Sequence, residues 1–397
     1  MKNSFQKHSW KLVLILLLLA VFFVFAVTKK TDSPSVNQEV TSVVKNPEVV
    51  TNESVVSENT ELPLFTQWEI FTKKDGLPSD KANCAKIDGD RVLIGTDKGL
   101  AIYQDNKWTV LTTEDGLSHN NILSIDVSDL TGDVWLATLS GLDRWSAGKF
   151  EVFNQFNSGL ANDVIYSVIC DQQFVWTATA AGASMYDTYT NTWKIFNEQN
   201  APMHEPWTYG VCNGDDNIYI AAWGGGVIEY HKKDGHFRDH TDPDHEMEID
   251  LFPDDGVVHD ITTGVTYQNG VLWVGTYFGM SRYDGLHWQS YFDNTSGLAS
   301  NFINAIKAQG PIVYVCTDKG FSTFNSETWA SYFKTNSGGE VKISNGDQSK
   351  TINTNTSLSS NYIWGMDVKG DEIWLATGHG VSHAKASGKA ELDKRKL

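Results

Sequence analysis

Cysteine is scarce in this chain, which has four cysteines in 397 residues: Cys84, Cys170, Cys212 and Cys316. None of them belongs to a C-x-x-C pair, so the chain lacks the usual cysteine motifs of zinc fingers and redox enzymes. The spacing predicts buried free thiols rather than a disulfide framework. Cys170 and Cys212, on neighbouring sequence repeats, are the one pair worth testing for a disulfide.

Basic residues are also few. Lys and Arg number 31 against 49 Asp and Glu, which gives a formal net charge of −18. Nucleic-acid binding requires clustered basic side chains, so nucleic acid is not an expected partner. The chain also lacks the G-x-S-x-G segment of many hydrolases and any standard zinc-binding motif.

Long apolar runs are limited to one, which extends from Leu12 to Val27 between flanking lysines. We interpret residues 1–30 as a signal-anchor that crosses the membrane once, with a cleaved signal peptide as the alternative. Residues 31–62 contain no aromatic residue and are rich in Ser, Thr, Asn, Val and Glu, which predicts a disordered polar linker. The expected location is a bacterial inner membrane, with the rest of the chain in the periplasm or another exported space.

The remaining sequence repeats itself. The segment DVWLATLSGLDRW, residues 133–145, returns as FVWTATAAGASMY, VLWVGTYFGMSRY and EIWLATGHGVSHA. The last residue of the aligned A-T or G-T pair recurs at separations of 42, 41, 43, 54, 41 and 60 residues, and the series is Thr96, Thr138, Thr179, Ala222, Thr276, Thr317 and Thr377. A period near 42 with four short alternating strands is typical of a β-propeller blade.

The copies also indicate how the ring closes. A short segment that begins with Trp or Phe occurs seven times, in five copies with a second Phe or Tyr three positions later, and its first copy, Trp68–Phe71, precedes any complete repeat. The last repeat, around Trp374, lacks this segment, so we expect residues 68–71 to supply its outer strand. The sequence therefore predicts an all-β fold, a seven-bladed β-propeller of four-stranded blades over residues 63–386, with a charged C-terminal tail at 387–397.

One repeat, DGLSHNNILSIDVSDLTGDVWLATLSGLDRW at residues 115–145, resembles the repeat of two-component regulator propellers. That family often forms the periplasmic sensing part of membrane receptors, ahead of an immunoglobulin-like domain, a second membrane span and a histidine kinase. The present sequence departs from this plan because it has no second apolar span and no phospho-acceptor histidine segment. The resemblance implies an exported propeller without a kinase domain of its own.

Residues that recur in every repeat are expected to build the fold. The Trp or Tyr three positions before the recurrent Thr should be buried, and the Thr should bond neighbouring backbone. The glycines of the G-L-x-x-W/Y segment predict tight turns with positive φ, as at Gly141. The insertion 334–355 contains Asn345-Gly346 between alternating residues, which predicts a β-hairpin.

Residues that vary among the repeats are the candidates for function. The turn before each innermost strand carries Asp80, Asn120, Asp163, Pro206, Asp260, Asn301 and Asn361, which either cap their own turns or form a polar ring at one mouth of the channel. Three positions later stand Asn83, Leu123, Tyr166, Tyr209, Thr263, Asn304 and Trp364. Tyr166, Tyr209 and Trp364 are candidate ligand-binding residues for a sugar ring or a peptide, with plain packing as the alternative.

The fourth repeat differs most. His204, Glu205 and Trp207 have no counterparts in the other repeats, and we add them to the candidate channel mouth. A second hypothesis treats the protein as a propeller lyase or hydrolase, in which His204 and Glu205 act with His259 and Asp260 from the next repeat. No other sequence signature supports this enzymatic reading.

An acidic insertion follows the fourth repeat. Asp242, Asp244, Glu246, Glu248 and Asp250 occupy alternate positions, so an extended segment would place all five carboxylates on one face. Such a face suits Ca²⁺, although the EF-hand pattern is not met, and a solvated acidic loop is the alternative. No cofactor is required by any other motif. The sequence therefore favours an anchored, non-enzymatic module that binds a glycan, a peptide or a partner protein.

Overall fold

The structure is a computed structural model, and it describes residues 61–244, 255–346 and 348–392. The predicted signal-anchor and nearly all of the predicted linker lie outside these residues. Within the described residues no helix is both long enough and apolar enough to cross a membrane. One short 3-10 turn, η1 (Thr113–Asp115), is the only helical segment there, and every other regular element is a β-strand.

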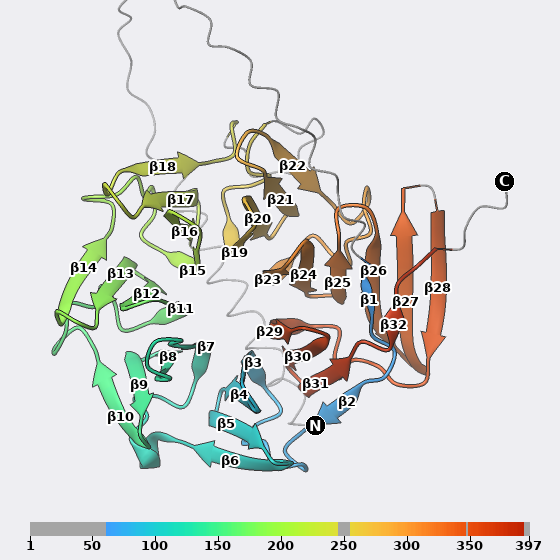
Figure 1. The fold of residues 1–397 in the computed structure, drawn as a ribbon, viewed down its shortest axis with the longest axis horizontal. Coiled ribbons are helices and arrows are strands. Elements are labelled where there is room, and N and C mark those ends of the chain that lie inside the picture. Colours follow the sequence, from blue (N-terminus) through green and yellow to red (C-terminus); the bar gives the residue numbers. More distant parts are fainter. Residues whose placement is uncertain (1–60, 245–254, 347, 393–397) are drawn as a thin grey trace, which may run out of the picture. The chain divides into compact units, whose positions relative to one another are not determined.

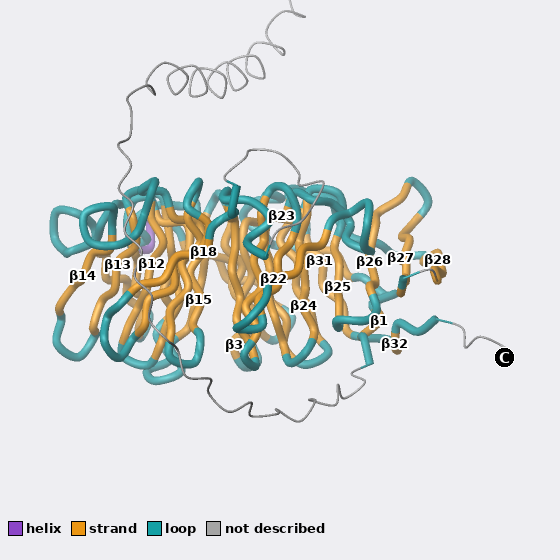
Figure 2. Tube along the Cα trace, turned by 90° about the horizontal axis from the view of Figure 1, so that it is seen from above, coloured by secondary structure: helices purple, strands orange, loops and turns teal. Residues whose placement is uncertain are grey.

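Seven antiparallel sheets surround a central channel (Figure 1). Each sheet is a blade whose innermost strand lies at the channel and whose outermost strand lies at the rim, and the strands run between two faces of loops (Figure 2). Six blades have four strands and one has six. The predicted all-β propeller with seven blades is therefore confirmed.

The first four blades follow the chain in order. Blades 1 and 2 consist of β3 (Ala82–Asp88), β4 (Arg91–Thr96), β5 (Gly99–Gln104), β6 (Lys107–Leu111), β7 (Ile122–Val127), β8 (Val134–Thr138), β9 (Leu142–Ser146) and β10 (Lys149–Phe153). Blades 3 and 4 consist of β11 (Ile165–Asp171), β12 (Phe174–Thr179), β13 (Gly182–Asp187), β14 (Thr192–Phe196), β15 (Thr208–Asn213), β16 (Asn217–Ala222), β17 (Gly226–His231) and β18 (Phe237–His240).

The remaining blades complete the ring. Blades 5 and 6 consist of β19 (Thr262–Gln268), β20 (Val271–Thr276), β21 (Met280–Tyr283), β22 (Trp288–Tyr291), β23 (Ile303–Gln309), β24 (Ile312–Thr317), β25 (Phe321–Phe324), β26 (Trp329–Thr335), β27 (Gly338–Asn345) and β28 (Gln348–Thr354). Blade 7 consists of β29 (Ile363–Lys369), β30 (Glu372–Thr377), β31 (Gly380–Lys385) and the N-terminal β2 (Glu69–Phe71).

The ring closes as predicted, because β2 pairs with β31 and joins the blue and red ends of the chain in Figure 1. A second closure was not foreseen: β1 (Pro63–Leu64) pairs with β32 (Gly388–Lys389). Ala390 and Leu62 are buried beside this pair. The propeller thus extends beyond residue 386, and the segment assigned to a charged tail begins as part of the fold.

Blade 6 carries the predicted hairpin as two additional strands, β27 and β28, which lie outside β26. Figure 1 shows them projecting from the ring. Gly346 in their turn has a φ of 55°, in the left-handed region that the Asn-Gly pair predicts. Blade 6 is therefore wider than the others.

The hydrophobic core lies between adjacent blades, where the recurrent aromatics are packed. Trp135, Trp176 and Trp374 are each 1% exposed. The hydroxyl of Thr138 donates to the carbonyl of Gly141 at 2.8 Å and so closes the turn between β8 and β9. Gly141 has a φ of 134°, and a Cβ there would lie 2.5 Å from the carbonyl oxygen of Phe153. The predicted structural roles of these residues are confirmed.

All four cysteines are free thiols, so Cys170 and Cys212 do not form a disulfide. Cys316 is fully buried, and the other three are partly buried. Burial raises the pKa of Cys84 to about 12, with a smaller opposing effect from the Gly95 backbone. The thiols are therefore held in the unreactive protonated form at neutral pH.

Candidate functional site

One irregularity recurs in all seven innermost strands. Each strand shifts register by one residue against its neighbour, and the residue at the shift is Asn83, Leu123, Tyr166, Tyr209, Thr263, Asn304 or Trp364. A β-bulge of this kind bends the strand and redirects a side chain. These are the seven variable positions that the repeat alignment identified.

The seven bulge residues line one pocket at the end of the channel where the innermost strands begin, which we call the mouth. This pocket has a volume of about 270 Å³, and its other lining residues are Lys81, Asn121 and Tyr277. A second cavity of about 340 Å³ continues down the channel between the innermost strands. The bulges therefore place the variable side chains at a single concave surface.

Four aromatic side chains line the mouth, and three more pack against them. We call Tyr166, Tyr209, Trp223, Tyr277, Phe302, Tyr362 and Trp364 the aromatic arc. Its first five members form a continuous series of contacts, with ring centroids 4.7, 5.3, 5.5 and 3.9 Å apart in that order. Tyr362 and Trp364 form a separate pair at 4.5 Å. The arc spans blades 3 to 7.

Blades 1 and 2 contribute no aromatic residue to the arc, and polar groups stand at the mouth there instead. Lys81 places its Nζ 5.7 Å from the ring centroid of Trp364. The amide nitrogen of Asn83 donates to the Oδ1 of Asn121 at 2.8 Å and to the carbonyl of Ile122 at 2.9 Å. These bonds join blades 1 and 2 and fix the amide at the mouth. The pocket thus has aromatic faces on one side and an amide and an ammonium group on the other.

The tyrosines of the arc are neutral at physiological pH. Burial raises the pKa of Tyr166 and Tyr277, and burial together with the neighbouring Tyr166 and Tyr277 raises that of Tyr209. A neutral phenol keeps its hydroxyl hydrogen as a donor. The arc can therefore offer flat apolar faces and hydroxyl groups without adding negative charge.

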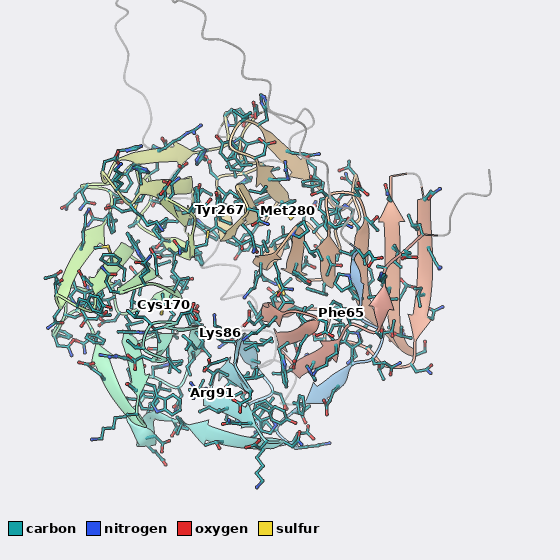
Figure 3. All side chains as sticks on the ribbon, in the orientation of Figure 1. Phe65, Lys86, Arg91, Cys170, Tyr267 and Met280 are labelled. Carbon is teal, nitrogen blue, oxygen red and sulfur yellow. The ribbon has the colours of Figure 1, made fainter. Side chains whose placement is uncertain are left out.

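Deeper in the channel, charged residues from neighbouring blades are paired. Lys86 contacts the Oδ1 of Asp126 at 2.6 Å, and Lys307 contacts Asp367 (Figure 3 labels Lys86). Burial opposes the charge on Lys86, but the carboxylates of Asp126 and Asp367 hold its pKa above the usual range. Two cations and two anions balance each other, so this part of the channel carries no net charge from them.

The Asp and Asn residues in the turns that precede the innermost strands accept hydrogen bonds from the backbone. Asp80, Asn120, Asp163, Asp260, Asn301 and Asn361 each accept a backbone N–H from the end of the preceding blade, at 2.6–2.9 Å. Each residue therefore ties one blade to the turn that begins the next. The bonds reach 7 to 27 residues back along the chain, so these residues link blades rather than cap their own turns.

His259 has a structural task of its own. Its Nδ1 accepts the backbone N–H of Ile261 at 2.9 Å, as the Nδ1 of His119 does for Asn121. The ring is fully buried and stacks on Phe278 with centroids 4.0 Å apart. Burial lowers the pKa of His259, with a smaller opposing effect from Asp260. The residue is therefore a neutral turn-forming imidazole.

The other candidates of blade 4 lie on the turn that leads into β15. His204 and Trp207 are exposed, and Glu205 packs on the β16–β17 turn, where a Cβ on Gly224 would lie 3.5 Å from its Cγ. The carbonyl of Trp207 accepts the N–H of Trp223 at 2.8 Å. The β16–β17 turn is one residue longer than the corresponding turn of blade 2, and this presents Trp223 to Tyr209.

The acidic insertion is only partly described. Asp242 is 1% exposed and its N–H donates to Asp260, whereas Asp244 is exposed. The two residues lie outside any strand, so the alternation expected of an extended segment does not apply to them. Glu246, Glu248 and Asp250 lie outside the described residues, and the Ca²⁺ site stays a prediction.

Sequence reasoning missed Tyr277, Phe302 and Tyr362. All three stand at variable positions of the repeat: Tyr277 directly follows the recurrent Thr276, and Phe302 and Tyr362 directly precede an innermost strand. An alignment of those two turn positions across the seven repeats would have shown aromatics in blades 5 to 7 and Lys81 or Asn121 in blades 1 and 2. The signal was therefore present in the sequence.

No protein-family model and no curated protein matches this sequence. Among solved structures, the chain is similar to extracellular domains assigned to the hybrid two-component systems BT3049 and BT4673 of B. thetaiotaomicron. The TM-scores are 0.62 and 0.61 at 16% and 18% identity, over 81% and 80% of this chain. The match spans 42% and 40% of those two chains.

The chain is also similar to virginiamycin B lyase from Staphylococcus aureus, with a TM-score of 0.57 at 11% identity, over 80% of this chain and 98% of the lyase. At such identities the likenesses describe the fold. They agree with the resemblance of the repeats to two-component regulator propellers. The described residues are therefore a seven-bladed β-propeller with the fold of part of those extracellular two-component domains.

Proposed function

We propose that this protein is an exported, sensor-like binding module that holds a glycan at the mouth of its channel. The observation that carries the proposal is that four members of the aromatic arc line the 270 Å³ pocket: Tyr166, Tyr209, Tyr277 and Trp364. A sugar ring stacks on an aromatic face and bonds polar groups at its edge, and the mouth offers both kinds of surface.

Two further features support an uncharged ligand. The tyrosines remain neutral, and the charged residues deeper in the channel are paired with each other. Among the residues that line the pocket, Lys81 is the only one with a charged side chain. A strongly charged ligand would therefore find no cluster of opposite charge there. A peptide with exposed aromatic or aliphatic side chains is the second ligand class that this chemistry fits.

Export and membrane anchoring belong to the same proposal. The apolar run of residues 12–27 and its flanking lysines support them, and so does the extracellular origin of the similar domains. A module of this kind would act as a sensor or a scaffold. The lyase or hydrolase alternative loses support because His259 is committed to its turn.

Thermal unfolding of the full-length protein with panels of neutral oligosaccharides and of peptides tests the proposal, because a ligand of the native state raises the midpoint. The shift should survive EDTA and disappear in a Tyr166→Ala/Tyr209→Ala/Trp364→Ala variant. Tyr189→Ala is the control, since Tyr189 is 69% exposed on the β13–β14 turn, at the opposite end of the strands. A shift that persists in the triple variant would place the ligand elsewhere.

A further inference from the structure

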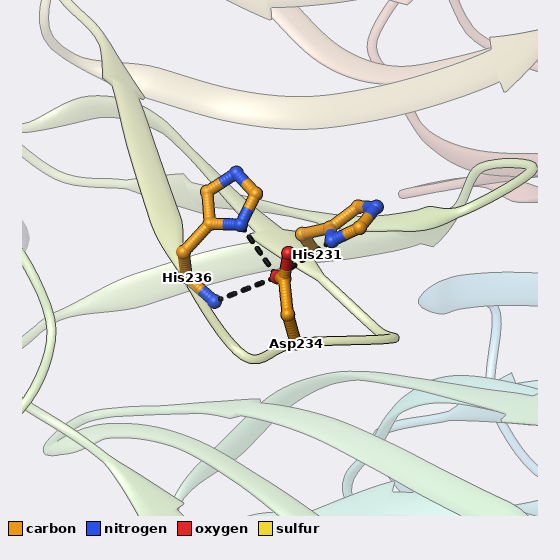
Figure 4. A group of neighbouring side chains, drawn as sticks. All are labelled: His231, Asp234 and His236. Atoms are coloured by element: carbon orange, nitrogen blue, oxygen red, sulfur yellow. Dashed lines mark hydrogen bonds and ion pairs between the residues drawn. The ribbon is translucent and has the colours of Figure 1, made fainter.

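The turn between β17 and β18 brings three metal-ligating side chains together. His231, Asp234 and His236 offer one ligand atom each, and these atoms all lie within 4.8 Å of one another (Figure 4). No other group of three or more His, Cys, Asp and Glu residues comes this close among the residues that the structure describes. This turn lies at the opposite end of the strands from the mouth, so the group is separate from the proposed ligand site.

Backbone hydrogen bonds fix the turn. The N–H of Gly235 donates to the carbonyl of His231 at 2.9 Å, and the N–H of His231 donates to the carbonyl of His236 at 3.0 Å. Gly235 has a φ of 75°, which favours glycine. The carboxylate of Asp234 also accepts the N–H of His236 at 3.2 Å. The three side chains are therefore held together before any ion arrives.

The two imidazoles converge on one oxygen. The Nδ1 atoms of His231 and His236 lie 2.6 and 2.5 Å from the Oδ1 of Asp234. Two nitrogen donors and one carboxylate oxygen form a donor set that transition metals prefer over Ca²⁺ or Mg²⁺.

One neighbouring cation, Lys232, is directed away from the group. Lys232 follows His231, but its Nζ is directed to the Oδ1 of Asn213 at 2.8 Å and to the Oδ2 of Asp171 at 3.3 Å. The side chains of Asp234 and His236 are 55% and 64% exposed. The net charge of −18 further favours the approach of a divalent cation.

We propose that His231, Asp234 and His236 bind one divalent transition-metal ion of the Zn²⁺ class. The Nδ1 atoms and the Oδ1 atom supply three ligands, and the remaining positions stay open to water or to an outside donor. Without the ion, the Nδ1 atom of each imidazole directs a hydrogen at the carboxylate. When the ion binds, it takes the place of that hydrogen, and each imidazole carries its proton on Nε2 instead. The competing explanation is that the Asp234 carboxylate only accepts hydrogen bonds from the two imidazoles and binds no ion.

Metal titration of the full-length protein, purified without a histidine tag and dialysed against EDTA, tests the site. Isothermal titration with ZnCl₂ should show a component of one ion per chain, and CoCl₂ should produce the visible absorption of a nitrogen-ligated ion. Asp234→Asn and His236→Ala should each weaken this component by at least ~10- to 100-fold, the loss found even for outer partners of metal ligands.

His287→Ala is the matched control, because His287 is an exposed histidine that pairs with a single carboxylate, Asp255, at 2.8 Å. This variant should keep the wild-type titration. Circular dichroism verifies that each variant is folded. Absence of Zn²⁺ and Co²⁺ binding in the wild type, or an unchanged stoichiometry and affinity in both folded site variants, would overturn the proposal in favour of the capping role.

Discussion

Tyr166 of blade 3 and Tyr209 of blade 4 stack across the boundary between their blades, with ring centroids 4.7 Å apart and planes inclined by 28°. Both residues occupy the bulge of their innermost strand. The contact therefore joins two repeats through side chains that the recurrent core does not need. It also forms the beginning of the aromatic arc.

Tyr209→Ala is expected to weaken the binding of a neutral oligosaccharide that shifts the wild-type midpoint. The loss of a stacking face should cost about 1–2 kcal/mol, or roughly 5- to 30-fold in affinity. Isothermal titration checks this. Leu123→Ala, at the equivalent bulge of blade 2, should have a smaller effect. Equal losses in both variants would argue against stacking on the arc.

Asp143 should make the stability of the protein depend on pH. Its side chain is fully buried and accepts hydrogen bonds from the N–H and the hydroxyl of Ser118. Four other blades have a serine at this position: Ser184, Ser281, Ser322 and Ser382. Burial, only partly offset by these bonds, raises the pKa of Asp143 to about 7. The folded protein thus binds a proton that the unfolded chain, with a pKa of about 3.9, has released.

Between about pH 4 and pH 7 the folded state therefore holds more protons, so this residue's contribution to stability falls as pH rises. Asp143→Ser should raise the free energy of unfolding by a few kcal/mol at pH 8, on the scale of about 1.4 kcal/mol per pKa unit. The gain should be much smaller at pH 4. Urea unfolding at both pH values checks this, and an equal effect at both would refute it.

Asp367 links blades 6, 7 and 1 at the ring closure. Its Oδ2 accepts the N–H of Ile87 at 2.7 Å, and its Oδ1 contacts Lys307. Asp367→Ala leaves both groups without this partner, so we expect a loss of roughly 2–4 kcal/mol in unfolding free energy. Asp88→Ala, which removes a more exposed pair with Arg91, should cost about 0–1 kcal/mol. Comparable losses in the two variants would contradict the linking role.

Tyr332 anchors the second closure. Its buried hydroxyl donates to the carbonyl of Pro63 at 3.1 Å and accepts the N–H of Phe65 at 3.4 Å. Tyr332→Phe should destabilise the protein by about 1–2 kcal/mol. Amide hydrogen exchange at Phe65 and in β32 should accelerate, while exchange in blade 3 stays unchanged. Uniform acceleration through all blades would indicate global destabilisation instead.

The fold could be predicted because the repeats combine several independent signals. The buried Trp135, the turn-closing Thr138 and the positive-φ Gly141 each have one physical task that recurs with the blade period. The position of the Trp68–Phe71 segment identified the first closure. The second closure could not be found in this way, because β1 and β32 have two residues each and no repeat to compare with.

The site was predicted in part. Tyr166, Tyr209 and Trp364 were found because they vary at one repeat position, and the bulge that brings them to the mouth has no sequence pattern of its own. His259 was grouped with possible catalytic residues because a sequence does not show that Nδ1 accepts a backbone N–H. His231, Asp234 and His236 match no standard metal motif, and their convergence depends on the conformation of the turn at Gly235.

Four of the seven bulges place at the mouth side chains that make no hydrogen bond to a neighbouring blade. Each bulge residue stands outside the regular pairing of its strand. The side chains of Asn83, Thr263 and Asn304 bond the backbone of the next blade, so only the other four, Leu123, Tyr166, Tyr209 and Trp364, can be replaced without removing such a bond. The propeller thus displays four side chains around one opening that its strand pairing does not use. Libraries randomised at these four positions alone should yield folded proteins that differ at the mouth.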